Sequence, residues 1–326
     1  MPGATERRAP RVQAAILPAL VLAGLMAWSA PGDAGPLRER LAARQEAATD
    51  DDADEVQGAR FPLPAGIVLH ADQAYGTHPR QRFDVHAPAD ARQAPVLLLV
   101  HGGGWQRGDK GLRTLLEHKL KRWVPRGFIV VSTNYRLVPD ADPAEQALDL
   151  ARALATVQAR AATWGGDGQR VILIGHSAGA HLAALLSADP ARATAVGARP
   201  WLGSVLLDSG ALDVPGILGA RHLPLYDRAF GADPARWQAA SPYHALGPAA
   251  RPMLAVCSTQ RAAPCPEAER FAVAARAHGA RVDIRREDRS HRDINRLLGD
   301  DPVYTEAVER FLRSLDPLVA ARLAGG

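Results

Sequence analysis

Two glycine-rich stretches hold the residues best suited to chemistry, and each follows an apolar run. They are HGGGW (His101–Trp105) and GHSAG (Gly175–Gly179). A serine hydroxyl becomes a useful nucleophile only when it is exposed, lies near a base and faces donors that stabilise an oxyanion. Glycines on both sides of Ser177 allow a sharp strand-to-helix turn that would expose its hydroxyl. The pattern predicts acyl-transfer chemistry with Ser177 as the nucleophile.

The oxyanion that such a serine creates needs backbone N–H donors. Ala178 would open the helix after Ser177, where the N–H groups are free and the helix dipole favours negative charge. A loop after an earlier strand must supply further donors, and Gly103 and Gly104 stand in that place. We therefore expect an oxyanion hole formed by Gly103, Gly104 and Ala178.

The base is expected to be a histidine late in the chain, on a loop after the last strand. His291, in REDRSHRDIN, fits this position among the 11 histidines of the sequence. His101 and His176 belong to the two glycine motifs, where backbone geometry rather than proton transfer is at issue. His291 is therefore the predicted base.

The acid that should orient His291 is less well defined. The loop after PMLAVCS, where this architecture usually places it, reads TQRAAPCP and has no carboxylate. Asp208 ends the preceding strand-like segment, SVLLDSG, and is the favoured candidate. Glu267, at the start of the next predicted helix, is the alternative. A serine–histidine pair without a carboxylate stays open as the third possibility.

Strand-like and helix-like segments alternate along most of the chain, which predicts an α/β domain with a mostly parallel sheet and helices on both faces. We place this domain at residues 67–316. Its first two strands, within 67–88, have no helix between them and should form an antiparallel edge. Residues 211–250 are too long for a simple crossover and are predicted to form a cap. Residues 317–326 are predicted to be a tail.

The N-terminal region has a different character. Basic residues precede an apolar stretch that is followed by small residues, so residues 1–29 are predicted to be a signal peptide, with a membrane anchor as the alternative. Residues 30–66 are acidic and are interpreted as a disordered linker. The predicted location is periplasmic or secreted, or anchored in a membrane and facing outside.

Composition excludes some classes of partner and leaves others open. The formal charge is only +4, without a basic run in the body of the chain, which argues against nucleic acid as a partner. Cys257 and Cys265 could form a disulfide or remain free thiols, and no His or carboxylate cluster accompanies them at metal-ligand spacing. We expect no metal and no organic cofactor. The oligomeric state is left open.

In their order and type, HGGGW, GHSAG, LLDSGALD and the late SH-x-x-IN resemble the motifs of the α/β-hydrolase fold. The resemblance covers about residues 67–316 and is to the carboxylesterase branch with feruloyl-esterase-like, acetyl-xylan-esterase-like and hormone-sensitive-lipase-like enzymes. It implies Ser177 as nucleophile, His291 as base and the oxyanion hole named above. Members of this branch carry an Asp in the segment that reads RAAPCP here, where Ala263 stands; an acid at Asp208 would be similar to the pancreatic-lipase arrangement.

These observations predict a serine carboxylesterase that cleaves small carboxylic esters through an acyl-enzyme. An arylformamidase-like amidase is one alternative, because an HGG-x-W loop also occurs in such enzymes. A binding protein that keeps the fold but has lost its catalytic carboxylate is the other, motivated by TQRAAPCP.

Overall fold

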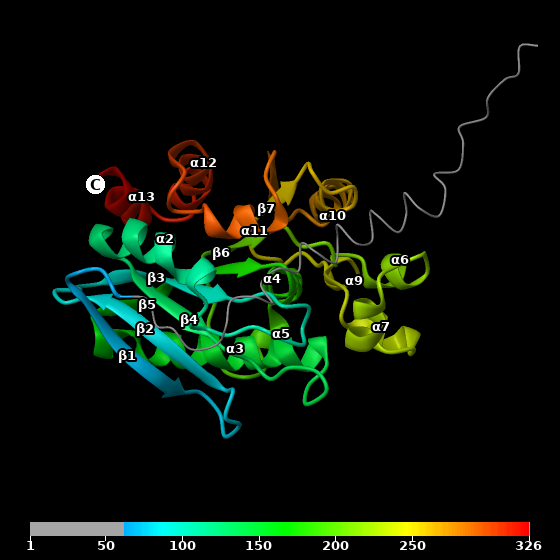
Figure 1. Ribbon diagram of the computed structural model, residues 1–326, viewed down its shortest axis with the longest axis horizontal. Coiled ribbons are helices and arrows are strands. Elements are labelled where there is room, and N and C mark those ends of the chain that lie inside the picture. The colour runs from blue at the N-terminus through cyan, green and yellow to red at the C-terminus, as the bar shows by residue number, and fades with distance from the viewer. Residues whose placement is uncertain (1–61, 326) are drawn as a thin grey trace, which may run out of the picture. The chain divides into compact units, whose positions relative to one another are not determined.

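The computed structural model describes residues 62–325. The predicted signal peptide or anchor (1–29) and nearly all of the predicted linker (30–66) lie outside this range. The described residues form one eight-stranded sheet with helices on both faces (Figure 1). This is the α/β architecture that the alternation of segments predicted.

The strands follow the order β1-β2-β4-β3-β5-β6-β7-β8 across the sheet. Their bounds are β1 (Ile67–Ala74), β2 (Arg82–Pro88), β3 (Ala94–Val100), β4 (Ile129–Thr133), β5 (Gly166–His176), β6 (Gly203–Leu207), β7 (Met253–Ser258) and β8 (Val282–Glu287). The pairs β1·β2 and β2·β4 are antiparallel, and all the other pairs are parallel. The predicted antiparallel edge is thus present.

Helices of eight or more residues cover both faces of the sheet. They are α2 (Arg113–Trp123), α3 (Pro143–Arg160), α4 (Ala178–Ala188), α10 (Pro264–Ala277), α12 (Pro302–Arg313) and α13 (Pro317–Ala324). Shorter helical segments are η2 (Val124–Arg126), η3 (Ala161–Trp164), α5 (Ala191–Thr194) and α11 (His291–Arg296). Figure 1 shows α2, α12 and α13 on one side of the sheet and α3 and α5 on the other.

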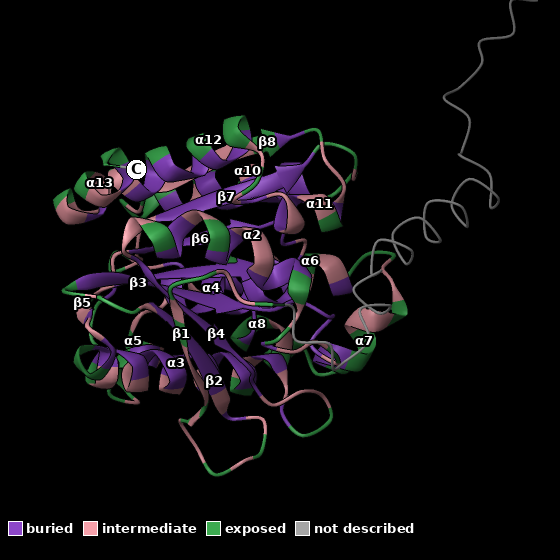
Figure 2. Ribbon diagram, turned by 60° about the vertical axis from the view of Figure 1, so that its left-hand side comes forward, coloured by how far each residue is buried: buried purple, intermediate pink, exposed green. Residues whose placement is uncertain are grey.

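The two cores of the domain lie on opposite faces of the same strands. In β3, Val96 and Leu98 pack with α3 and α4, whereas Leu97 and Leu99 pack with α2 and α12. All four side chains are fully buried, as the colouring of the central strands in Figure 2 indicates. A strand buried on both faces has no polar face, and this explains the continuous apolar runs before HGGGW and GHSAG.

The C-terminal segment differs from the prediction. Residues 317–326 were expected to be a tail, but residues 317–324 form α13. Asp316 caps this helix by accepting from the N–H groups of Leu318 and Val319, and Val319 and Leu323 are buried in the core beside α12. The domain therefore extends beyond residue 316, because this short amphipathic helix closes one core.

The predicted cap, residues 211–250, contains four short helices. They are α6 (Val214–Leu218), α7 (Pro224–Phe230), α8 (Pro234–Ala239) and α9 (Pro242–Ala245). Each has a proline in its first turn, where the missing N–H costs nothing. The cap is thus built from short helices rather than from one long crossover helix.

None of the helices between residues 62 and 325 is both long and apolar enough to span a bilayer.

The approach of α4 to β3 yields a stability prediction. A Cβ at Gly179 would lie 2.3 Å from the Val100 carbonyl oxygen and 2.5 Å from that of His101. Because both are backbone atoms, at the end of β3 and directly after it, they cannot move aside as a flexible side chain could. Gly179→Ala is expected to lower the free energy of unfolding by about 1–3 kcal/mol, as at other overpacked sites, measured by urea denaturation.

Gly247→Ala is the matched control, since no heavy atom lies within 4 Å of the added Cβ. It should change stability by less than about 0.5 kcal/mol. Equal stability of the two variants would contradict the packing argument.

Candidate active site

Ser177 lies at the turn between β5 and α4, with φ 52° and ψ −117°. A non-glycine residue rarely adopts positive φ, and the conformation costs about 1–3 kcal/mol. The turn is held from the neighbouring strand, because the Ser177 N–H donates to the Leu207 carbonyl at 2.9 Å. It is also tight: a Cβ at Gly175 would lie 2.3 Å from the Gly179 carbonyl oxygen. The glycines of GHSAG are therefore required by the close approach of strand and helix.

Strained backbone is concentrated around this turn. Among the described residues, five non-glycine residues have positive φ, and three of them are Trp105, Ser177 and Asp208. All three line one cavity, although they come from three separate loops after β3, β5 and β6. Strain of this kind persists only where the surroundings fix it, and it gathers at functional sites.

The HGGGW loop follows β3 and approaches the same cavity. Gly103 and Gly104 have φ of 104° and 58°, which favours glycine at both positions. The end of the loop is anchored by the Trp105 carbonyl, which accepts from the Val138 N–H at 3.0 Å and the Gln146 amide at 2.9 Å. Gly104 and Ala178 both line the cavity, whereas Gly103 is not among its lining residues. The structure thus brings two of the three predicted oxyanion donors to the cavity wall.

Trp105 connects this loop to the cap through His181. The Trp105 indole N–H donates to His181 Nδ1 at 3.1 Å, and His181 Nε2 lies 2.7 Å from the Ala240 carbonyl. Burial lowers the pKa of His181 to about 4, so the ring is neutral at pH 7. A neutral ring that accepts at Nδ1 must donate at Nε2, which matches the two contacts. His181 therefore holds the loop and the cap together.

His291 is the first residue of α11, whose N-cap Ser290 accepts from the Asp293 N–H at 3.1 Å. His291 Nδ1 lies 2.7 Å from Asp208 Oδ2. The His291 carbonyl accepts from His176 Nε2 at 3.1 Å, so His176 of the GHSAG motif also positions the histidine loop. The late loop predicted from the sequence is thus a short helix that starts at the site.

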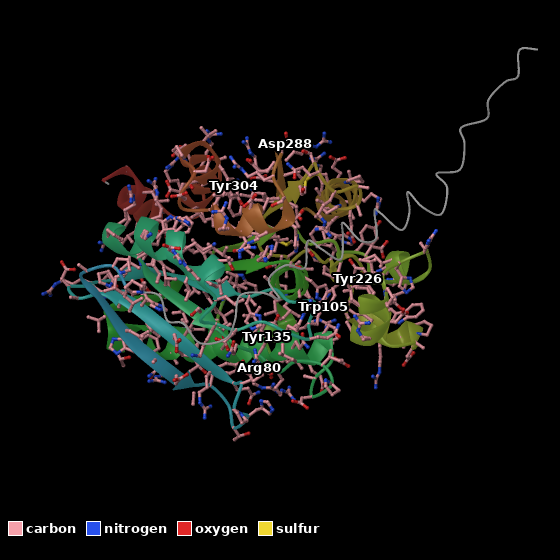
Figure 3. The ribbon with its side chains drawn as sticks, in the orientation of Figure 1. Arg80, Trp105, Tyr135, Tyr226, Asp288 and Tyr304 are labelled. Carbon is pink, nitrogen blue, oxygen red and sulfur yellow. A yellow bond between two sulfur atoms is a disulfide. The ribbon has the colours of Figure 1, made fainter. Side chains whose placement is uncertain are left out.

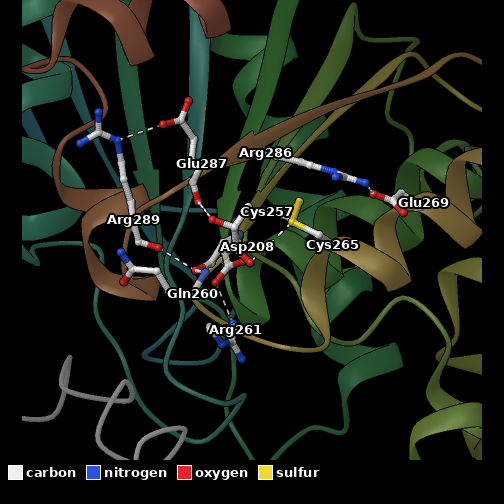
Figure 4. Close-up of a disulfide and its surroundings, with 11 residues drawn as sticks. Asp208, Cys257, Gln260, Arg261, Cys265, Glu269, Arg286, Glu287 and Arg289 are labelled. Atoms are coloured by element: carbon white, nitrogen blue, oxygen red, sulfur yellow. Dashed lines mark hydrogen bonds and ion pairs between the residues drawn. A yellow bond between two sulfur atoms is a disulfide. The ribbon is translucent and has the colours of Figure 1, made fainter.

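Asp208 directly follows β6 and is fully buried. Besides His291, its carboxylate has two partners. Oδ1 accepts from the Ser258 N–H at 2.7 Å. Oδ2 accepts from Arg261 Nη1 at 2.7 Å, as Figure 4 shows. Burial by itself would raise the pKa of Asp208, but the hydrogen bond and charge of His291, the charge of Arg261 and the Ser258 N–H hold it well below its usual range. The carboxyl is therefore ionised at neutral pH.

Glu267, the alternative acid, is placed elsewhere. Its Oε1 accepts from the N–H groups of Leu212 and Asp213, at 2.7 and 2.8 Å, at the start of the cap. Burial raises its pKa to about 7 despite these two hydrogen bonds. Ala263, where relatives of the predicted family carry an Asp, is the N-cap of α10. The side chain of that loop that contacts His291 is Arg261.

Ser177, Asp208 and His291 line a cavity of about 40 Å³, together with Gly104 and Ala178. Its far wall comes from the cap, through Leu223, Leu225 and Tyr226. The Trp105 and Tyr226 rings are 5.9 Å apart, and Figure 3 labels the two residues near each other, Tyr226 on α7. A second cavity, of about 400 Å³, shares Gly210, Leu223 and Tyr226 with the first.

The aromatic residues of the cap have different positions. Tyr226 lines the cavity, whereas Phe230 packs on Trp105 at 4.8 Å between ring centroids. Trp237 donates to the Gly231 carbonyl at 2.8 Å, and the ring of Tyr243 is partly exposed and not at the cavity. One ring therefore faces the site and the others stabilise the cap.

Three contributions to the site had been missed from the sequence. Arg261 and the Ser258 N–H hold Asp208, and His181 joins Trp105 to the cap. A disulfide links Cys257 and Cys265, one of the two states left open, and it encloses the loop that carries Arg261. The short spacing of the two cysteines around TQRAAP was the available signal. Within residues 62–325, no group of three or more His, Cys, Asp or Glu side chains is arranged to hold a metal ion.

Part of the amino-acid sequence is similar to that of known proteins. Residues 83–195 match the family model described as BD-FAE. A probable isoprenylcysteine alpha-carbonyl methylesterase of Oryza sativa subsp. japonica is 39% identical over 111 residues, which is 34% of this chain and 25% of that protein. Esterase LipQ of Mycobacterium tuberculosis is 43% identical over 106 residues, 32% of this chain and 25% of that protein. The chain thus aligns with about a quarter of the length of these relatives.

Solved structures match over much more of the chain. Esterase B from Lactobacillus rhamnosis superposes with a TM-score of 0.65 at 20% identity, covering 88% of this chain and 95% of that one. Thermogutta terrifontis esterase 2 gives a TM-score of 0.61 at 23% identity, covering 78% and 96%. The chain has the α/β-hydrolase fold. The fold that the motifs implied is thereby confirmed for this α/β-hydrolase domain.

The buried carboxyl of Glu267 makes the stability of this α/β-hydrolase domain depend on pH. Its pKa is about 7 in the folded state and about 4.5 when unperturbed. Between these values the folded state binds more protons than the unfolded state, so this group's contribution to stability falls as the pH rises and becomes constant only about one unit above the folded pKa. Glu267→Gln removes the titration. Relative to the wild type, the variant should gain about 2–3 kcal/mol in free energy of unfolding between pH 5 and pH 8.

Glu269→Gln, on the same helix but with its side chain 40% exposed, is the control and should show no such gain. Urea denaturation at the two pH values measures both variants. A parallel response of Glu267→Gln and wild type would contradict the burial argument.

Proposed function

We propose that this α/β-hydrolase domain is a serine carboxylesterase that cleaves small carboxylic esters through an acyl-enzyme intermediate. The observation that carries the proposal is the convergence of three residues in one cavity. Ser177 occupies a strained turn, His291 lines the same cavity, and His291 contacts the buried carboxylate of Asp208. Nucleophile, base and orienting acid are the roles that such a constellation fills.

The tautomer of His291 follows from its contact with Asp208. A carboxylate oxygen and an imidazole nitrogen 2.7 Å apart must share a hydrogen, since two lone pairs would repel. Because Asp208 is ionised, that hydrogen belongs to His291 Nδ1. Nε2 is then left with a lone pair, as a general base requires.

The reaction is proposed to follow from this arrangement in two halves. His291 Nε2 accepts the proton of the Ser177 hydroxyl while Oγ attacks the ester carbonyl carbon, and the N–H groups of Ala178, Gly104 and Gly103 stabilise the oxyanion. His291 then returns the proton to the leaving alcohol as the C–O bond breaks. Water, deprotonated by His291, hydrolyses the acyl-enzyme and restores Ser177.

The size of the cavity favours a short acyl group. About 40 Å³ beside Ser177 holds roughly three water molecules. The adjoining cavity of about 400 Å³ offers more room for the other part of the ester. The BD-FAE match supports a substrate specificity similar to that of feruloyl-esterase-like and acetyl-xylan-esterase-like enzymes. We include this specificity in the proposal.

A periplasmic or secreted location is part of the proposal. Two observations support it: the signal-like pattern of residues 1–29 and the Cys257–Cys265 disulfide, a bond that persists mainly in oxidising compartments.

Covalent labelling tests the nucleophile. A fluorophosphonate probe should modify purified protein at Ser177, located by mass spectrometry, and Ser177→Ala should be unlabelled and lose at least about 10³-fold in kcat on p-nitrophenyl acetate. Wild-type protein that is folded but neither labelled nor active would refute the esterase. Preference for N-formylkynurenine over the acetate ester would instead favour the amidase alternative.

A second test identifies the acid. In Asp208→Asn the amide NH₂ would face His291 Nδ1 and favour the wrong tautomer, so kcat should fall by about 10³–10⁴-fold. Glu267→Gln leaves the His291 contact untouched and should keep kcat within about threefold. Circular dichroism verifies that both variants are folded. A larger loss in Glu267→Gln than in Asp208→Asn would exclude the proposed role of Asp208.

A further inference from the structure

Arg261 is the one residue of the TQRAAP loop that reaches both members of the acid–base pair. Its Nη1 lies 2.7 Å from Asp208 Oδ2, a contact that Figure 4 shows. The same Nη1 lies 3.0 Å from His291 Nδ1. The side chain is 15% exposed and lines the cavity beside Ser177. A cation from the loop in which this architecture usually places the acid therefore contacts the carboxylate of Asp208.

The contact with His291 is not a productive hydrogen bond. A guanidinium has only donors, and His291 Nδ1 already donates to Asp208. Arg261 therefore acts on the ring in two ways. It fixes the carboxylate oxygen to which the ring donates, and it places a positive charge next to an imidazole that must become positive during the reaction.

The loop that presents Arg261 is held at several points. The disulfide joins its two ends at Cys257 and Cys265. On the opposite side, the Thr259 N–H donates to the Glu287 carbonyl at 2.9 Å, and the Ser258 hydroxyl donates to the Arg289 carbonyl at 2.6 Å. Both carbonyls belong to the chain that leads from β8 to His291. The guanidinium is thereby fixed relative to the imidazole by backbone contacts.

We propose that Arg261 is a positioning residue that holds the Asp208 carboxylate against His291 Nδ1 and sets the pH range in which His291 can act as a base. The inference rests on the proposed esterase function for its kinetic consequence. Its physical content, the effect of Arg261 on the protonation of His291, can be measured without any substrate.

Other titratable and charged groups surround the same pair. His176 of β5 lies 4.5 Å from His291 between ring centroids, and Tyr304 of α12 donates its hydroxyl hydrogen to the Ile294 carbonyl behind it. At the end of β8, Glu287 pairs with Arg285 and Arg289. Unlike Glu287, Arg285 and Arg289, the Arg261 guanidinium contacts the imidazole itself. Its removal should therefore change the protonation of His291 more than removal of these groups would.

The test compares Arg261→Met, which removes the charge, with Arg261→Lys, which keeps it. Without a neighbouring cation the imidazole protonates more readily. The His291 titration midpoint, followed by NMR of labelled histidine and assigned with His291→Gln, should rise by about one pH unit or more in Arg261→Met. The acidic limb of the pH profile of kcat/KM should shift by the same number of pH units. On the alkaline plateau, kcat should fall about tenfold with KM little changed, because Asp208 is less well held.

Arg261→Lys should keep the midpoint near that of the wild type and recover part of kcat. Arg286→Met is the matched control: it removes an exposed arginine beside the disulfide whose partner is Glu269 (Figure 4), and neither readout should change. If Arg261→Met does not fold, Arg261→Gln serves the same purpose.

An unchanged midpoint and limb in a folded, neutral Arg261 variant would overturn the inference. A shifted NMR midpoint in protein that hydrolyses no ester would leave the inference standing and refute the esterase function instead.

Discussion

The burial of one carboxylate constrains the whole site. Asp208 has no exposed surface, and an isolated ionised carboxylate in such a place would cost several kcal/mol. Three donors from three parts of the chain offset this cost: a backbone N–H at the end of β7, a guanidinium from the following loop and the imidazole after β8. Each donor lowers the free-energy cost of keeping the carboxylate charged, so the ends of β6, β7 and β8 must lie close together.

The other half of the site depends on backbone packing rather than on charge. Ser177 can adopt its strained turn only because glycines let α4 approach β5 and β3 closely. The same approach brings the HGGGW loop beside the N-terminus of α4. The Trp105–His181–Ala240 chain of hydrogen bonds then carries this arrangement into the cap. Geometry at the nucleophile and order in the cap are therefore coupled through one neutral histidine.

Much of this arrangement could be predicted from the sequence, and the failures have physical reasons. Periodic apolar runs indicated the sheet, and the glycine spacing in GHSAG indicated the turn at Ser177, because both depend on local geometry. The contact between Asp208 and His291 joins residues 83 positions apart. The order of strands and loops along the chain could not distinguish Asp208 from Glu267 as the acid. Arg261 was overlooked because a missing carboxylate, rather than the cation present, was the salient feature of TQRAAPCP. Helices α11 and α13 were missed because six- and eight-residue helices are defined by caps and burial more than by periodicity.

The disulfide that encloses residues 258–264 implies a difference between the newly made, reduced protein and the oxidised protein. The crosslink joins the end of β7 to the start of α10, on either side of the guanidinium. A newly made chain in a reducing compartment would fold with this loop tethered only by its hydrogen bonds. The acid–base pair would then reach its final electrostatic environment only where thiols are oxidised, as in the periplasmic or secreted location proposed above.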